Sequence, residues 1–212
     1  GLILLRRDAH DRLGEREQAA AWALKLDKHF FDKELARHLN DPQRTGERKL
    51  LDVPFVRQHH VTCAPATLTA ICHYWNKPAD HLEIAEEICY DGTPWHSERQ
   101  WVEDRGFVVR EFRTTPQAAR ELVDRGLPFT LTTVNAANAH LQAICGYDTL
   151  RGVLLMRDPY IPHIGEMLAD RMHEAYGATG PRGMVFVPQE EAYRLEGLDL
   201  PDQDAFDHYY HL

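Results

Sequence analysis

The sequence lacks several features that would mark a membrane, secreted or nucleic-acid-binding protein. It has no apolar run long enough to cross a bilayer and no secretory signal peptide, so we expect no membrane-spanning segment. It also lacks an excess of basic residues. Its 24 Lys and Arg stand against 33 Asp and Glu, a net charge of −9, which disfavours nucleic acid or an acidic membrane surface as its main partner. The apolar and charged fractions of 43% and 27% are typical of a globular protein and argue against disorder.

Cysteine is scarce and unpatterned. The four cysteines contain no CxxC pair, and a chain of 212 residues is large enough to bury a core without disulfides. Three of them, Cys72, Cys89 and Cys145, lie in apolar runs and are interpreted as small buried side chains. We therefore expect a reducing compartment and a cytoplasmic protein.

Metal and phosphate motifs are also missing. There is no HExxH motif among the 13 histidines, and the adjacent His59 and His60 point in different directions unless the backbone distorts. The glycine-rich segment 177–183 has neither the lysine nor the Ser/Thr of a phosphate loop, and it precedes a predicted strand. The sequence therefore predicts no metal and no cofactor.

The stretch from Leu51 to Asn76 organises the chain. A short extended apolar run, 53–56, leads to Gln58 and a polar turn, and a helix is predicted to begin at Cys63. Thr62 can cap this helix and proline follows in its first turn. Apolar residues then recur at helical spacing, at Leu68, Ile71, Cys72 and Trp75.

This placement suits a reactive thiol. At a helix start, unpaired backbone N–H groups and the helix dipole favour an anion, which lowers the pKa of a cysteine such as Cys63. The side-chain amide of Gln58, a few residues earlier, can donate to an oxyanion that forms at the sulfur. Taken alone, a cysteine among apolar neighbours is more often part of a core.

Two downstream segments complete a pattern. Asn138-Ala-His140 is followed by an apolar strand ending in Gly-Tyr-Asp148, and the apolar strand that begins at Val153 ends in Asp158-Pro159. With the Gln58 and Cys63 segment, these motifs over 51–187 resemble cysteine peptidase family 39. This papain-like, largely bacterial group includes the bacteriocin leader peptidases. The sequence departs from the family at Ala64, where glycine is usual, and at Thr62, where aspartate is common.

The resemblance implies a role for each residue of the set. Cys63 is the nucleophile, and His140 is the general base that takes the thiol proton and later protonates the leaving amine. Asp158 accepts a hydrogen bond from the second ring nitrogen of His140, and Gln58 shares an oxyanion hole with the backbone N–H of Cys63. Each position also has an ordinary interpretation: a structural histidine, an Asp-Pro turn, a solvated polar turn.

The resemblance further implies an α+β papain-like fold, in which a helical part carries Cys63 and an antiparallel sheet carries His140 and Asp158. The substrate is a peptide or protein, with small residues before the scissile bond. Two alternatives remain: an acyl- or peptidyl-transferase that uses the same residues, and a catalytically silent scaffold whose N-terminal helices dock a partner.

The element pattern agrees with helices first and strands later. Helices are expected over 79–90, 95–105, 115–126 and 165–176, and strands over 107–112, 128–134, 183–187 and the two that carry His140 and Asp158. A helical hairpin over 3–40, interrupted at Gly14, resembles part of a tetratricopeptide repeat. We divide the chain into a helical segment with its linker (1–48), the peptidase domain (49–190) and an acidic, loosely packed tail (191–212).

Overall fold

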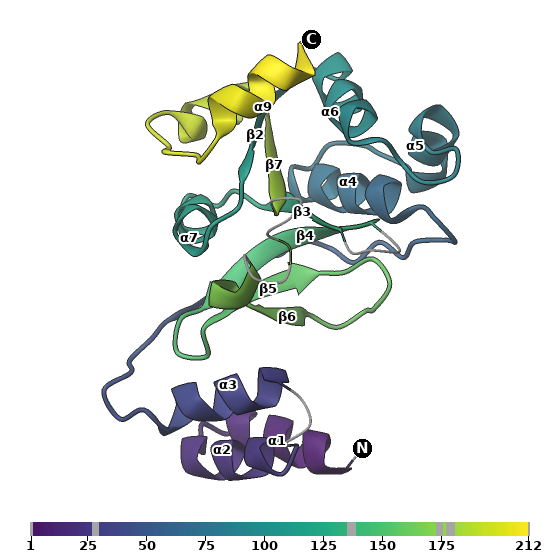
Figure 1. The fold of residues 1–212 in the computed structure, drawn as a ribbon. Coiled ribbons are helices and arrows are strands. Elements are labelled where there is room, and N and C mark those ends of the chain that lie inside the picture. Colours follow the sequence, from purple (N-terminus) through teal and green to yellow (C-terminus); the bar gives the residue numbers. More distant parts are fainter. Residues whose placement is uncertain (1, 27–29, 135–138, 173–175, 177–180, 212) are drawn as a thin grey trace. The chain divides into compact units, whose positions relative to one another are not determined.

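The computed structural model describes residues 2–26, 30–134, 139–172, 176 and 181–211 (Figure 1). The chain forms two compact units. The first is Gly1–Arg48 with Asp148–Val153, and the second is Lys49–Tyr147 with Leu154–Leu212. Each unit is described by itself.

Among its described residues, the first unit contains three helices where the sequence suggested a helical hairpin: α1 (Leu2–Arg12), α2 (Arg16–Leu24) and α3 (Phe30–Asn40). Gly14 allows the turn between α1 and α2 because its φ of +75° is in the left-handed region. The small core consists of Ala19, Ala20, Ala23, Leu35, Ala36 and Leu39. Alanines at these positions let helix backbones approach closely. The likeness to a tetratricopeptide repeat stays a prediction.

The turn 148–153 belongs to this helical unit through polar contacts. His38 Nδ1 bonds to the Arg151 carbonyl oxygen at 2.8 Å, and Arg44 donates to the Thr149 carbonyl oxygen at 3.1 Å. Arg151 also pairs with Asp11. Residues 148–153 thus pack with the helices, a long-range association within this unit that the sequence does not signal.

The second unit is built on a sheet with the order β2-β7-β3-β4-β5-β6, and β1 pairs with β4. The strands are β1 (Arg48–Leu50), β2 (Phe107–Arg113), β3 (Phe129–Val134), β4 (Ala139–Asp148), β5 (Val153–Arg157), β6 (Gly165–Leu168) and β7 (Arg182–Pro188). β7 lies antiparallel to both β2 and β3, and β3 lies antiparallel to β4.

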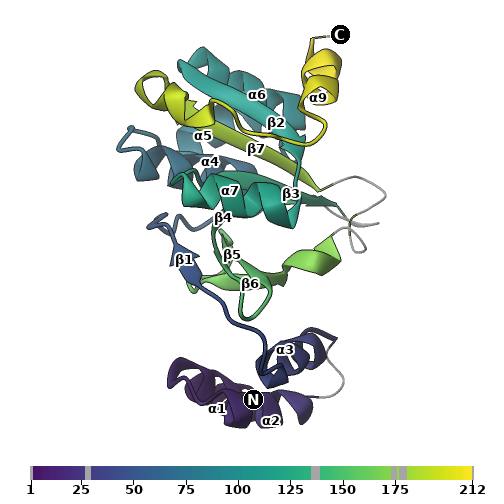
Figure 2. The same ribbon diagram turned by 90° about the vertical axis from the view of Figure 1, so that its left-hand side faces the viewer.

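Helices cover both faces of this sheet (Figures 1 and 2). They are α4 (Cys63–Tyr74), α5 (His81–Ile88), α6 (Trp95–Asp104), α7 (Pro116–Asp124) and α9 (Gln203–Tyr210). Side chains alternate along β7: Val185 and Val187 join the core under α7, whereas Met184 and Phe186 join the core under α4, α5 and α6. The α+β class and the antiparallel sheet that carries His140 are confirmed.

Local signals correctly marked several helix ends. Thr115 caps α7 by accepting from the Ala118 N–H at 3.1 Å, and Gly126 follows the helix with φ of +73°. α4 ends where Asn76 adopts φ of +54°. Thr62 precedes α4 as expected, but its hydroxyl does not cap the helix. It closes the preceding turn instead, bonding to the N–H and the carbonyl oxygen of His59 at 3.0 and 2.9 Å.

Two expectations are wrong. Residues Gly165–Leu168 form strand β6, followed by a 3-10 helix over Ala169–Arg171, so no helix begins at Gly165. The C-terminal tail is not loosely packed: it contains a 3-10 helix (Gln189–Leu195) and α9, and it buries Leu195 and Leu200. Asn138 and residues 177–180 of the glycine-rich segment lie outside the described residues.

Candidate active site

Cys63 is the first residue of α4, as expected, and its side chain is half-buried. The helix is fixed because Leu68 and Ile71 are fully buried against the sheet. One turn after the cysteine, the Thr67 hydroxyl donates to the Leu141 carbonyl oxygen of β4 at 3.1 Å. This bond holds the start of α4 against the strand residue that follows His140.

His140 and Asp158 lie on neighbouring strands. His140 is near the start of β4, and Asp158 directly follows the end of β5. Their side chains meet, with His140 Nε2 3.1 Å from Asp158 Oδ2. Asp158 Oδ1 accepts from the Tyr160 N–H at 2.7 Å, which holds the carboxylate in the orientation that His140 needs. Since Nε2 faces the aspartate, Nδ1 is left to face the sulfur.

The surroundings of Cys63 favour the thiolate. Burial opposes ionisation, but hydrogen bonds from His140 and from the Leu141 backbone N–H, with the charge of His140, outweigh it and lower the pKa of Cys63. The negative charge of Glu98 acts in the opposite direction and is the weakest of these effects. A lowered thiol pKa at a helix start is the environment in which cysteines react.

The pKa of His140 shifts in the opposite direction, upward. Burial disfavours its charged form, but hydrogen bonds to Asp158 and Cys63 and their negative charges raise the pKa of His140 to about 9. Burial likewise opposes ionisation of Asp158, and the bonds from His140 and Tyr160 lower the pKa of that carboxyl. All three shifts therefore act in favour of the thiolate, the imidazolium and the carboxylate.

Gln58 lies in the segment that leads to the cysteine. Its backbone N–H donates to the Pro159 carbonyl oxygen at 3.0 Å, which places the glutamine beside the Asp158-Pro159 turn. Its side-chain Nε2 donates to the His60 carbonyl oxygen at 2.9 Å, and this bond uses one of its two amide hydrogens. The oxygen Oε1 is buried without a hydrogen-bond partner among the described residues.

Sequence reasoning missed a buried charge cluster near this site. Arg182 of β7 bonds to Glu98 of α6 at 2.8 Å and also pairs with Glu111 of β2, a side chain with no exposed surface. Burial, more than the opposing effect of Arg182, raises the pKa of Glu98 to about 7. The sequence offered little sign of the cluster, because Glu111 lies in β2 with Arg110 and Arg113, and charged residues in a strand are more often solvent-facing.

His59, in the turn before Cys63, stacks on His81 of α5. The rings of His59 and His81 lie parallel with centroids 5.2 Å apart. Within the described ranges, no three His, Cys, Asp or Glu side chains are grouped so that they could hold a metal ion. Nor does any helix in the described part of the chain have the length and apolarity to span a membrane.

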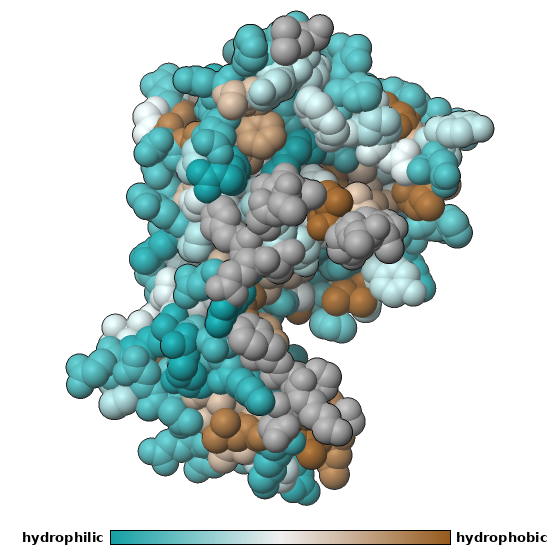
Figure 3. All heavy atoms as spheres, viewed as in Figure 1, coloured by the Kyte–Doolittle hydropathy of each residue, from teal (hydrophilic) through white to brown (hydrophobic). Residues whose placement is uncertain are grey.

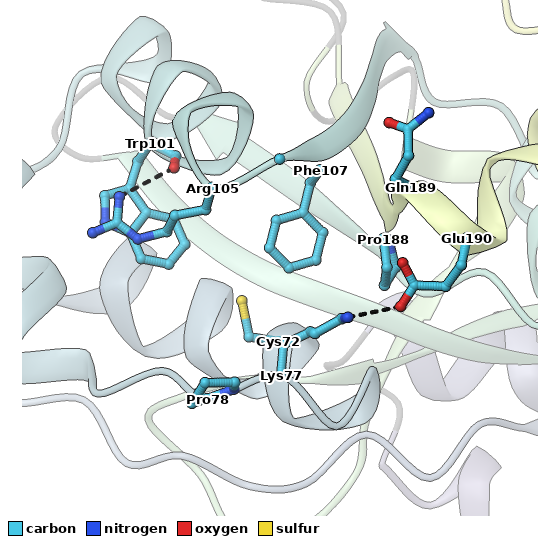
Figure 4. A pocket seen from close by; sticks show the side chains of 10 residues that line it. Cys72, Lys77, Pro78, Trp101, Arg105, Phe107, Pro188, Gln189 and Glu190 are labelled. Atoms are coloured by element: carbon cyan, nitrogen blue, oxygen red, sulfur yellow. Dashed lines mark hydrogen bonds and ion pairs between the residues drawn. The ribbon is translucent and has the colours of Figure 1, made fainter.

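A separate cavity of about 330 Å³ lies at the opposite end of α4 from Cys63 (Figure 4). Its apolar lining includes Trp101, Phe107 and the thiol of Cys72, with an ion pair between Lys77 and Glu190 at its rim. Burial raises the pKa of Cys72 to about 12, so this thiol is not a nucleophile at neutral pH. The residues for which the sequence predicted chemistry lie at the Cys63 end of the helix.

Comparisons with known proteins show the family and the fold. Residues 50–183 match the model of a family described as Peptidase_C39 like family. The fold is similar to the peptidase domain of Streptococcus ComA, a bi-functional ABC transporter involved in a quorum sensing pathway, with 18% identity and a TM-score of 0.54. That match covers 65% of this chain and 99% of the ComA chain.

Two further solved structures share the fold. A putative C39-like peptidase from Bacillus anthracis has 15% identity and a TM-score of 0.54, covering 68% of this chain and 98% of its own. A double glycine motif protease from the AMS/PCAT transporter, solved with its leader peptide, has 16% identity and a TM-score of 0.52. The latter match covers 66% of this chain and 95% of the protease. A search of curated proteins finds no significant match.

Proposed function

The chain belongs to the Peptidase_C39 like family, and on this premise we propose that it is a cysteine peptidase in which Cys63 is the nucleophile. The observation that carries the proposal is the bond of 3.1 Å between His140 and Asp158, together with the opposite pKa shifts of Cys63 and His140. A structural histidine would not need a carboxylate on one side and a half-buried thiol on the other.

In the first half-reaction the thiolate of Cys63 attacks the carbonyl carbon of a peptide bond, and a C–S bond forms. The oxyanion accepts hydrogen bonds from the Cys63 backbone N–H and from the second amide hydrogen of Gln58. The imidazolium of His140 then gives its proton to the leaving nitrogen as the C–N bond breaks. The products are an amine and an acyl-thioester.

In the second half-reaction neutral His140 takes a proton from water as the oxygen attacks the thioester carbon. The C–S bond breaks, Cys63 leaves as thiolate, and the proton stays on His140. Asp158 accepts from Nε2 throughout, which keeps Nδ1 directed at the sulfur and stabilises each imidazolium that forms. The free carboxylic product departs with one oxygen from solvent.

The substrate is proposed to be a peptide. Support comes from the double glycine motif protease, which was solved in complex with a leader peptide. Family resemblance favours small residues before the scissile bond.

The test is a digest of a mixed peptide library in water enriched in ¹⁸O, read by mass spectrometry. We expect new C-terminal carboxylates that carry one ¹⁸O atom with the wild-type chain, and none with Cys63→Ala. Cleavage that persists in Cys63→Ala would refute the assignment. Addition of amines separates hydrolysis from transfer, because a transferase would release amine conjugates in place of ¹⁸O-labelled acids.

A further inference from the structure

An open depression of about 590 Å³ lies between α6 and α9. It is lined by Trp95, His96, Gln100, Tyr209, Tyr210 and His211. Trp95 and Tyr209 are 42% and 69% exposed, a large solvent-facing area for such side chains. The lining thus consists of aromatic rings and hydrogen-bonding side chains.

The C-terminal helix that forms one wall is firmly attached. Arg99 of α6 bonds to Asp207 of α9 at 2.8 Å and stacks on the Tyr210 ring at 4.0 Å. The Tyr210 hydroxyl donates to Glu103 at 3.0 Å. Because α9 follows the segment 50–183 that matches the family, this wall is an addition of this chain to the family domain.

The other wall connects the depression to the active site. Trp95 lies one helical turn before Glu98, whose charge acts on Cys63. Arg182 joins the two positions, since it bonds to Glu98 at 2.8 Å and to the Trp95 carbonyl oxygen at 3.2 Å. In Figure 2, α9 stands at the same end of the sheet as the end of β3, the strand that pairs with His140.

The charges beneath the depression are unbalanced. Two guanidiniums, those of Arg99 and Arg182, contact four carboxyls, of which two are buried and two are partly exposed, so the carboxyls outnumber the guanidiniums. The carboxyls belong to Glu98, Glu103, Glu111 and Asp207. The negative charge also affects Tyr210. Burial, the hydrogen bond to Glu103 and the charge of Glu103 raise the pKa of Tyr210 to about 12.

Exposed aromatic faces beside the partly exposed carboxylates of Glu103 and Asp207 favour a cation. The rings accept it through their negative π faces, and Gln100 with the two histidines can bond to its N–H groups. We propose that this depression binds a lysine or arginine side chain of the peptide substrate and so sets specificity near the scissile bond. The inference rests on the proposed function and adds to it a preference that the family domain alone does not supply.

The test uses the full chain with Cys63→Ala, so that bound peptide is not cleaved. Labelled decapeptides of Gly, Ala and Ser carry one lysine at successive positions, and matched peptides carry glutamine there. Fluorescence anisotropy gives each Kd. We expect a lysine peptide to bind more tightly at one position, and Tyr209→Ala or Trp95→Ala to weaken it about 3- to 30-fold, the range of a cation–π contact.

Tyr90→Ala is the matched control, because Tyr90 is a fully exposed ring outside the depression. Equal binding of lysine and glutamine peptides would overturn the inference, as would equal losses in Tyr209→Ala and Tyr90→Ala. The outcomes separate the two proposals. Lysine-selective binding with an inactive wild-type chain would refute only the peptidase, and cleavage without a basic preference would refute only the subsite.

Discussion

The pairing of Cys63 with His140 can be tested without a substrate, through the pH dependence of alkylation. His140 supplies both a hydrogen bond and a positive charge that lower the pKa of Cys63. In His140→Ala only the bond from the Leu141 N–H remains to offset burial. A hydrogen bond to a charged group contributes about 1.5–3 kcal/mol, which corresponds to about one to two pKa units. The pH midpoint of Cys63 alkylation in His140→Ala should rise by that amount.

The shape of the pH profile of Cys63 alkylation follows from the pKa shifts of Cys63 and His140. The thiolate–imidazolium pair prevails above the lowered pKa of Cys63 and below the His140 pKa of about 9. Wild-type labelling should therefore persist below about pH 8.5, the ordinary thiol value. In His140→Ala the midpoint should lie above that value, so that labelling at pH 6.5 slows about 10- to 100-fold.

The assay is timed labelling with iodoacetamide from pH 5 to 10, followed by mass spectrometry of the Cys63 peptide. Cys72 and Cys145, 1% and 0% exposed, are internal references that should label only if the chain unfolds. His163→Ala removes an exposed histidine and should match the wild type. Identical Cys63 profiles in the wild type and His140→Ala would refute the ion pair and leave Cys63 a structural cysteine.

Three further changes test the surroundings of this pair. Asp158→Asn keeps a hydrogen-bond acceptor for His140 but removes a negative charge that, against burial, holds the pKa of His140 at about 9. The alkaline limb of the pH profile of kcat/KM should therefore move to lower pH. An unmoved alkaline limb would contradict this role of Asp158. Glu98→Gln removes a charge that adds to burial in raising the pKa of Cys63, so its alkylation midpoint should fall; a rise would show that Glu98 acts otherwise. Gly183→Ala would place a Cβ 2.6 Å from both Phe112 Cζ and Thr114 Oγ1. Urea unfolding should show a loss of about 1–3 kcal/mol from this overpacking, and an unchanged midpoint would mean that β7 shifts at no cost.

The sequence by itself determined features that depend on neighbours along the chain. Both ends of α7 could be predicted from the sequence. A helix start needs a side chain that accepts a hydrogen bond from a backbone N–H within three residues, and a helix end needs a residue that can adopt positive φ. The placement of Cys63 at the start of α4 followed from the proline in the first turn of the helix, although the expected cap at Thr62 does not form. The spacing of its motifs was sufficient to indicate the family and the α+β class.

Tertiary structure decided what depends on residues far apart. The strand Gly165–Leu168 was mistaken for a helix because a short apolar segment takes its form from the sheet beside it. The acidic tail lacked a strong apolar pattern, yet Asp207 is held by Arg99, more than a hundred residues earlier. Only the fold brings Arg99 and Arg182 together with the buried Glu98 and Glu111, because a buried charge is tolerable only where its partners converge.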